Sequence, residues 1–383
     1  MKYPYFNDAH ESLRLEVREF AEKEIRPLAA GLDEREEFSI ELTRKMGRNG
    51  WFGIFLPQEY GGRGMDYRSL VLVVEELARV DSSQAATVAA HNSLGIGPIY
   101  QFGTPEQKKK YLPKLCSGDF VWAFGLTEED AGSDSRATKT TAVLKNGYWE
   151  LNGSKKFISN AASSLSAGAS LQVVTGTDEK GEKELSVILV DRDTPGYHPE
   201  KITGKMMWRA VDNAHIIINN CRVPAENLLG ERGKGSHIML QTLDSGRLTI
   251  GAVALGLARG AFEMARDYAN KRVQFGKPIA RFQAIAFKLA DMATRIEAAA
   301  NLLYHAVWLK DNGQPFGKNS AMAKLYCSEV ARYVVNEAVQ IHGAYGLMKS
   351  NDIERFYRDQ RILEIGEGTS EILRLVISRQ IGI

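Results

Sequence analysis

The sequence predicts a mainly α-helical protein with a β domain in the middle of the chain. Three observations lead to this fold class. Residues 8–30 and 66–118 carry apolar positions at helical spacing, with Phe52–Gly64 as a turn-rich break between them. Short β-rich runs separated by turn residues begin near Val121. Helical patterns return after Gly235, so we expect an α–β–α order of elements.

The β-rich region begins with a hairpin signal. Asn146-Gly147 separates two apolar runs and suits a type I′ turn, because both central residues of that turn need positive φ. Three further runs predict more strands of a small antiparallel domain: Leu171–Thr175, Leu185–Asp191 and His215–Asn219.

The C-terminal region carries the longest helical patterns. Ile285, Leu289, Met292, Ile296, Ala299, Leu303 and Ala306 are alternately four and three residues apart, which places them on one face of a helix. A second long helix is expected over 318–341, after a break at Pro315, and a last one from about Thr369. The predicted domains are therefore 1–120, 121–234 and 235–383.

Composition limits the classes of function. The 383 residues include 49 basic and 47 acidic side chains, a balance that gives no electrostatic reason to expect nucleic acid or a membrane surface as a partner. The N-terminus lacks an apolar signal segment, and no membrane span is expected. Three scattered cysteines and seven scattered histidines predict neither disulfides nor a metal site. We expect a cytoplasmic protein.

General chemical motifs give no function. The chain contains no GxGxxG, no GxxxxGK[ST] and no HExxH sequence, so a dinucleotide-binding fold, a P-loop and a zincin are unsupported. Longer motifs are more informative. They are Leu126–Glu128, Ala131–Asp134, Asn152–Asn160, Arg222–Gly230, Asp244–Arg247, Arg272–Ile279, Phe282–Gln283, Ala338–Gly343, Tyr357–Asp359 and Glu367–Ile372.

In this order and spacing, these motifs resemble the acyl-CoA dehydrogenase family. Pro57–Gly62 extends the resemblance to nearly the whole chain. The resemblance implies an N-terminal helical domain, a middle antiparallel β domain and a C-terminal four-helix bundle. It also implies FAD, an acyl-CoA substrate, a homotetramer and an electron-transferring flavoprotein as electron acceptor.

Glu367 matches the family's catalytic base. The resemblance implies that its carboxylate removes the α-proton of a thioester while the β-hydrogen leaves as hydride to flavin N5. The family stabilises the enolate oxygen with the backbone N–H at this position and a ribityl hydroxyl of FAD. Some members carry the base at the position of Gly246, where glycine offers no carboxylate. The alternative for Glu367 is a surface acid at the start of a helix.

Two further sets of residues match cofactor positions in the family. Phe124, Leu126, Thr127, Phe157 and Ser159 resemble the isoalloxazine cradle, and Ser133 resembles a contact to CoA or to the FAD pyrophosphate. Phe157 could instead be an ordinary core aromatic. The second set resembles residues that reach the FAD of a neighbouring subunit or its adenosine end. It comprises Arg272, Gln274, Phe275, Phe282, Gln283, Gln340, Gly343, Ala344, Thr369 and Glu371; the family often has glycine at the place of Ala344.

The substrate site is matched by fewer residues. Asp244 and Arg247 resemble the pair that meets CoA, although a plain salt bridge is the alternative for Arg247. Gly368 is expected beside the substrate, and His91 is either a substrate contact or a structural histidine. Gly366 stands where straight-chain enzymes often have tyrosine, which favours a branched, alicyclic or aryl acyl group unless other side chains refill the space.

Other functions stay open at this point. Ala85 stands where glutaryl-specific members have arginine, which counts against a dicarboxylic substrate, although Arg136 is a possible unaligned cation. The remaining alternatives are a straight short-chain dehydrogenase, an oxidase or flavin monooxygenase on the same fold, and a non-catalytic flavoprotein.

Overall fold

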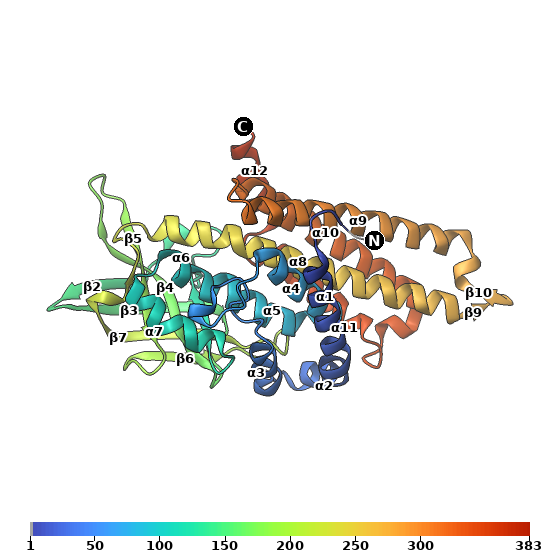
Figure 1. Cartoon of the computed structure of the whole chain (residues 1–383), viewed down its shortest axis with the longest axis horizontal. Coiled ribbons are helices and arrows are strands. Elements are labelled where there is room, and N and C mark those ends of the chain that lie inside the picture. Colours follow the sequence, from blue (N-terminus) through green and yellow to red (C-terminus); the bar gives the residue numbers. More distant parts are fainter. Residues whose placement is uncertain (1–2) are drawn as a thin grey trace.

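The computed structural model describes residues 3–383. The molecule is elongated, with the β-sheet at one end and long helices running to the other (Figure 1). The first part of the chain is helical. Its elements are α1 (Asp8–Phe20), η1 (Ala21–Ile25), α2 (Arg26–Arg35), α3 (Ile40–Arg48), η2 (Gln58–Tyr60), α4 (Tyr67–Ala78), α5 (Ser82–Ala90), η3 (His91–Ile96), α6 (Gly97–Phe102) and α7 (Pro105–Cys116).

The starts of these helices follow from local side-chain chemistry. Asn7, Ser39, Asp66, Asp81 and Thr104 are N-caps, and each accepts a hydrogen bond from a backbone N–H two or three residues further on. Such caps satisfy N–H groups that the first turn of a helix leaves without a partner. The sequence therefore fixes where these helices begin.

A single eight-stranded sheet follows, in the order β6-β7-β3-β2-β4-β5-β8 with β1 beside β4. The predicted hairpin is confirmed, since Asn146 and Gly147 have φ of 50° and 80° between β2 and β3. Most pairs are antiparallel, but β1 and β2 pair parallel with β4, because crossover connections separate them from it. The strands and the short helices among them are β1 (Val121–Gly125), η4 (Ser135–Ala137), β2 (Thr141–Lys145), β3 (Tyr148–Ser159), β4 (Ser166–Thr177), β5 (Lys183–Asp191), β6 (Tyr197–Lys201), β7 (Asn213–Pro224), η5 (Ala225–Asn227) and β8 (Leu228–Leu229).

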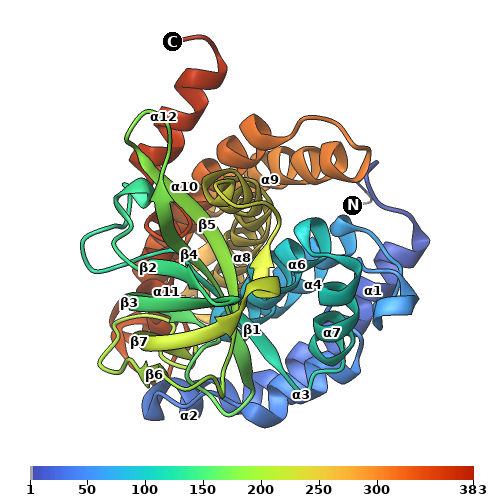
Figure 2. The ribbon, with the colours of Figure 1, turned by 90° about the vertical axis from the view of Figure 1, so that its left-hand side faces the viewer.

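The last part of the chain is a helical bundle built around α8. Figure 2 shows α8 surrounded by the other elements, and α12 projecting from the body. By length and composition α8 could cross a membrane, but 78% of its apolar window is buried inside the protein, as expected for a core helix. The elements are α8 (Gly235–Lys271), β9 (Val273–Gln274), β10 (Lys277–Pro278), η6 (Ile279–Arg281), α9 (Gln283–Asp311), α10 (Gly317–His342), η7 (Gly343–Leu347), α11 (Ile353–Asp359), η8 (Gln360–Glu364) and α12 (Ser370–Gln380). The predicted fold class is confirmed.

Two glycines let α8 pack directly on the backbone of α4. A Cβ atom at Gly256 would lie 2.1 Å from the carbonyl oxygen of Glu75, and one at Gly260 would lie 2.2 Å from that of Arg79. Any larger residue would force the two helices apart. This contact fixes α8, which carries several candidate site residues, against the N-terminal helices.

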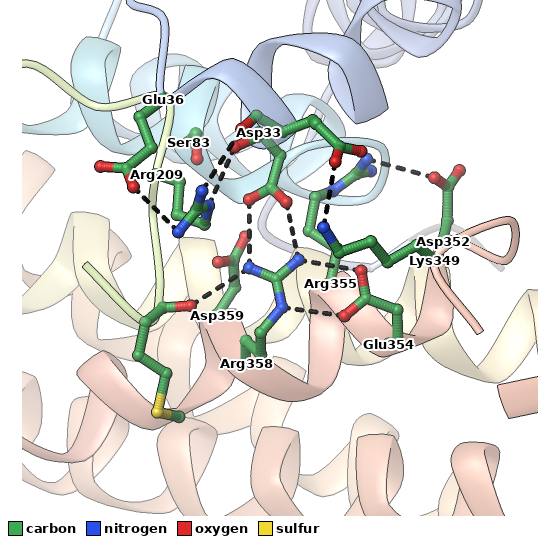
Figure 3. Close-up of polar contacts among 12 residues, drawn as sticks. Asp33, Glu36, Ser83, Arg209, Lys349, Asp352, Glu354, Arg355, Arg358 and Asp359 are labelled. Atoms are coloured by element: carbon green, nitrogen blue, oxygen red, sulfur yellow. Dashed lines mark hydrogen bonds and ion pairs between the residues drawn. The ribbon is translucent and has the colours of Figure 1, made fainter. Parts of the chain in front are cut away.

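Polar contacts join the three parts of the chain at α11 (Figure 3). The guanidinium of Arg358 donates to both carboxylate oxygens of Asp33 in α2, at 3.2 and 2.7 Å, and to the carbonyl of Met206 in the loop before β7. Buried Asp359 accepts hydrogen bonds from the Trp208 backbone N–H and from the Ser82 hydroxyl, both at 2.7 Å. The Tyr357–Asp359 motif therefore has a structural role in joining distant segments.

We expect Asp33→Ala to lower the free energy of unfolding by about 1–3 kcal/mol, because it removes two charge-assisted hydrogen bonds between α2 and α11. Glu354→Ala is the matched control, since Glu354 binds the same guanidinium from within α11. Such a helix-local pair contributes only about 0.3–0.5 kcal/mol. Thermal denaturation of both variants checks the prediction, and equal losses would contradict it.

Candidate active site

Glu367 lies in the turn between η8 and α12, in an unusual backbone conformation. Its φ is +55°, and that of Gly368 is +103°. A left-handed conformation costs a residue with a side chain about 1–2 kcal/mol, and such strain concentrates at functional sites. Part of the residue is exposed, but Oε2 is buried and has no hydrogen-bond partner among residues 3–383. A buried carboxylate oxygen without a partner is rare and points to a functional group.

The surroundings of Glu367 adjust its proton affinity. Burial raises the pKa of the carboxyl group to about 7, and the positive charges of Lys324 and Arg247 oppose this rise. A carboxylate with a pKa near neutrality is half ionised at pH 7 and takes up protons better than an exposed one. Such a group suits the role of a general base.

Gly246 on α8 faces the carboxylate of Glu367. A Cβ atom at this glycine would lie 2.1 Å from Oε2 of Glu367 and 3.0 Å from Cδ2 of Leu94. The two positions at which the family resemblance places a base therefore converge on one point. The glycine provides the room that the carboxylate of Glu367 occupies.

Asp244 and Arg247 lie one turn apart on α8 and form an ion pair at 2.6 Å. The side chain of Arg247 is buried, and its Nη2 would lie 3.9 Å from a Cβ atom at Gly368. The structure thus brings this pair together with the Glu367 turn. A contact of the pair with CoA stays a prediction.

The turn ends where α12 begins. The hydroxyl oxygen of Thr369 accepts a hydrogen bond from the Ile372 backbone N–H at 3.3 Å, so its side chain is the N-cap of α12. Glu371 follows in the first turn of α12, where its own side chain is exposed. The contact of these two residues with the adenosine end of a cofactor stays a prediction.

His91 is fully buried and its ring uses both nitrogens. Nε2 lies 2.9 Å from the carbonyl oxygen of Leu115, and Nδ1 lies 3.1 Å from the backbone nitrogen of Trp122. Burial lowers the pKa of this histidine to about 4, so the ring is neutral at pH 7. Because no ring nitrogen is left for a substrate, the structure supports the structural alternative for His91.

The predicted flavin cradle lies along β1 and β3. The Lys156 backbone N–H donates to the carbonyl of Thr127, which places Thr127 beside Phe157. Phe157 has a φ of +62°, and 62% of its surface is exposed, so it is not a core aromatic. Next along β3, the hydroxyl of Ser159 accepts a hydrogen bond from the Asn213 amide. A strained, exposed aromatic beside polar groups fits a planar ring ligand such as the isoalloxazine.

A buried ion pair, not predicted from the sequence, supports this cradle. Lys155 is fully buried, and its ammonium group lies 2.7 Å from Glu128 and 3.2 Å from the carbonyl oxygen of Leu126. Glu128 also accepts hydrogen bonds from the backbone and the hydroxyl of Thr140. The pair holds the segment that contains Leu126 and Thr127 against β3. Phe124 is partly buried at the end of β1, and Ser133 lies in an exposed loop beyond it.

The other predicted cofactor residues lie far from Glu367 in the same chain. The β9–β10 hairpin projects from the end of the bundle opposite the sheet (Figure 1). Phe275 at its tip is 93% exposed. The guanidinium of Arg272 lies 5.8 Å from the ring centre of Tyr345, so η7 is at the same end. The predicted cofactor residues in the segments at this end of the bundle are Arg272, Gln274, Phe275, Phe282, Gln283, Gln340, Gly343 and Ala344. These residues can reach a flavin at the β domain only if it belongs to another subunit.

Comparison with known proteins identifies the family. Three models match in succession: the acyl-CoA dehydrogenase N-terminal domain over residues 7–119, the middle domain over 123–221 and the C-terminal domain over 233–382. The chain belongs to the acyl-CoA dehydrogenase family. The prediction of an acyl-CoA dehydrogenase is thereby confirmed, and family membership implies FAD as the cofactor.

Individual relatives match over almost their whole length. An acyl-CoA dehydrogenase of Bacillus subtilis is 44% identical over 96% of both chains. A 3-(aryl)acrylate reductase of Clostridium sporogenes is 42% identical over 98% of both chains. The solved structure of butyryl-CoA dehydrogenase from Megasphaera elsdenii superposes with a TM-score of 0.96 at 38% identity, covering both chains completely.

Two residues beside Glu367 were not predicted from the sequence. Tyr67 in α4 donates from its hydroxyl to the carbonyl of Ser245, and burial together with the nearby Glu367 raises its pKa. Lys324 lies on the buried face of α10. A lysine among buried alanines at helical spacing was a signal that could have identified Lys324. Nothing in the sequence around Tyr67 marks its role.

Proposed function

We propose that this enzyme dehydrogenates an acyl-CoA thioester between its α and β carbons, with Glu367 as the base for the α-proton. The observation that carries this proposal is the buried, unpartnered Oε2 of Glu367 opposite Gly246. The backbone N–H of Glu367 has no acceptor within the described part of the chain, so it can donate to the thioester oxygen as enolate charge develops there. Base and donor then come from one residue.

The residues present fit FAD. Phe157, Thr127 and Ser159 would hold the isoalloxazine ring, and Arg272 and Phe275 would serve a neighbouring subunit. When bound, FAD supplies the acceptor for the β-hydride. Exclusion of oxygen distinguishes a dehydrogenase from an oxidase of the same fold, and reoxidation of the reduced enzyme in air measures it.

For the acyl group we propose a branched, alicyclic or aryl substituent. The three atoms nearest to a Cβ atom built at Gly366 all belong to Ile362 and lie 3.6–3.7 Å away, so a side chain can begin here without a close contact, and glycine leaves that room unused. The aryl substrate in the name of the Clostridium sporogenes relative agrees with this proposal. The butyryl-CoA dehydrogenase neighbour favours the alternative, a straight short chain.

A panel of thioesters tests the proposed function. The purified yellow enzyme is mixed without oxygen with cyclohexanecarbonyl-CoA, 3-phenylpropionyl-CoA and butyryl-CoA, and loss of flavin absorbance is followed. Bleaching by any of them supports acyl-CoA dehydrogenation. Faster bleaching by the first two supports the proposed branched, alicyclic or aryl acyl group. A clear preference for butyryl-CoA would refute that proposal.

We expect Gly366→Tyr to change selectivity toward straight chains. The phenol ring would stand beside the base and compete with a bulky acyl group, so kcat/KM for cyclohexanecarbonyl-CoA should fall about 10–100-fold while that for butyryl-CoA changes much less. Gly366→Ala is the control for losing the glycine without adding a ring, and it should have a small effect. Steady-state kinetics with both substrates check the prediction. Equal losses on both substrates would contradict it.

The proposed partners follow from family membership. An electron-transferring flavoprotein is the proposed electron acceptor, and a homotetramer is the proposed assembly, in which the exposed β9–β10 hairpin meets another subunit. Sedimentation of the wild-type enzyme tests the assembly. A cytoplasmic location stays a prediction.

A further inference from the structure

The ammonium group of Lys324 lies directly behind the Glu367 turn. Lys324 belongs to α10 and is fully buried. Its Nζ donates a hydrogen bond of 2.7 Å to the carbonyl oxygen of Gly368, the residue that follows the base. Within the described chain no carboxylate forms an ion pair with it. A buried lysine without such a partner is uncommon, because removing an ammonium group from water is costly.

The Glu367 turn needs an external support. Both Glu367 and Gly368 have left-handed φ values, and Glu367 carries a side chain that disfavours this conformation. On its C-terminal side the N-cap of Thr369 fixes the start of α12. The hydrogen bond from Lys324 is a second attachment, formed from a different helix.

We propose that Lys324 is a positioning residue for the base: it clamps the turn through the Gly368 carbonyl and places a positive charge behind the Glu367 carboxylate. This inference rests on the proposed role of Glu367. It explains why a costly buried cation lies on the buried face of α10, where its neighbours are alanines and hydroxyl side chains such as Ser328 and no carboxylate of the described chain pairs with it.

The other charged groups around Glu367 do not replace Lys324. Arg247 on α8 is paired with Asp244, and Tyr67 on α4 is uncharged at neutral pH because its pKa is raised by burial. Lys324 also faces Glu364 of η8, whose carboxylate binds the exposed Arg332 and Arg361.

The direction of the charge effect follows from these neighbours. Burial lowers the pKa of Lys324 to about 8, while Glu367 raises it, so the lysine is mainly charged at pH 7. Its charge favours the ionised form of Glu367 and lowers the pKa of the base. Without that charge the pKa of Glu367 rises, and the base is protonated at neutral pH.

Two substitutions separate the clamp from the charge. Lys324→Met removes both, whereas Lys324→Gln keeps a donor for Gly368 and removes only the charge. In both variants we expect the acidic limb of the pH profile for flavin reduction to move up by about one pH unit, with about a tenfold loss of rate below the limb. At high pH the glutamine variant should recover its rate, and the methionine variant should recover less.

Lys114→Met is the matched control. Lys114 in α7 is another lysine whose pKa burial lowers, but its ammonium group lies 5.0 Å from the ring centre of Tyr111 and, within residues 3–383, contacts no candidate site residue. This control should leave the acidic limb in place. Infrared titration of the Glu367 carboxyl group in the FAD-free protein, with Glu367→Gln as the blank, should show the same shift without turnover.

Two outcomes distinguish the claims. If Glu367→Gln still bleaches with acyl-CoA, the proposed function of Glu367 is wrong. A second outcome concerns Lys324 alone. If Glu367→Gln is inactive, but both Lys324 variants show the wild-type pH dependence of flavin reduction and the wild-type pKa of Glu367 by infrared titration, the proposed role of Lys324 is overturned. The glutamine variant keeps the test intact if the methionine variant does not fold.

Discussion

Glu367→Gln should abolish flavin reduction by acyl-CoA while FAD and the thioester still bind. The amide has nearly the shape of the carboxylate but cannot accept the α-proton, and loss of a general base costs about 10²–10⁴ in rate. We expect a loss of at least about 10³-fold, because the pKa of Glu367 places the base near its optimum. Anaerobic stopped-flow measurement of flavin bleaching checks this. Bleaching at the wild-type rate would exclude Glu367 as the base.

The same carboxyl group predicts how the wild-type rate depends on pH. Only the ionised form accepts a proton, so flavin reduction should increase as pH rises through about 7 and level off above it. If the rate of flavin reduction instead increased near pH 4.5, the ordinary pKa of glutamate, burial would not raise the pKa of this base.

Glu367→Gln should also stabilise the FAD-free protein at alkaline pH. The folded-state pKa of Glu367 is raised above its unfolded value, so ionisation opposes folding. This penalty is absent below about pH 4.5, grows as pH rises and is complete above about pH 7. Its upper limit is about 3 kcal/mol. Denaturant titrations of both proteins at pH 5 and pH 8 measure the difference, which should be larger at pH 8.

Gly246→Ala should also reduce activity strongly, although less than loss of the base. The added methyl carbon would lie 2.1 Å from Oε2 of Glu367, so the carboxylate must move by more than 1 Å. Misplacing a reacting group by about 1 Å costs about 10²-fold in rate. We therefore expect kcat to fall about 100-fold with little change in FAD binding. An alanine variant with wild-type kcat would show that the carboxylate does not work from this position.

A pair of variants controls for general damage to α8. Glu367→Gly alone should be inactive, whereas Gly246→Glu in the same chain places a carboxylate at the same point from the opposite side. The double variant should regain part of the lost rate. Recovery of activity would show that a carboxylate at either position reaches the same reacting atom. If no activity returns, the loss of activity in the Gly246→Ala variant is attributed to disturbed packing of α8.

Much of the fold was predictable because its signals are local. N-cap residues, the Asn146-Gly147 turn and the apolar stripe of the 285–306 segment each act within a few residues of chain. The sequence did not predict that β1 and β2 pair parallel with β4, because strand order depends on how the whole chain returns to the sheet.

For the site, the ordered motifs by themselves determined the family, the position of Glu367 and the absence of a base at Gly246. Only the tertiary structure decided what surrounds that carboxylate. Lys324, Arg247 and Tyr67 come from three helices that meet at the Glu367 turn, and their effects depend on distance and burial. The hydrogen bonds of His91 depend in the same way on tertiary structure, because its two backbone partners, Leu115 and Trp122, lie more than twenty residues away. Residue types and their spacing specify which groups are available, but a pKa or a hydrogen bond between distant segments exists only once folding has brought them together and excluded water.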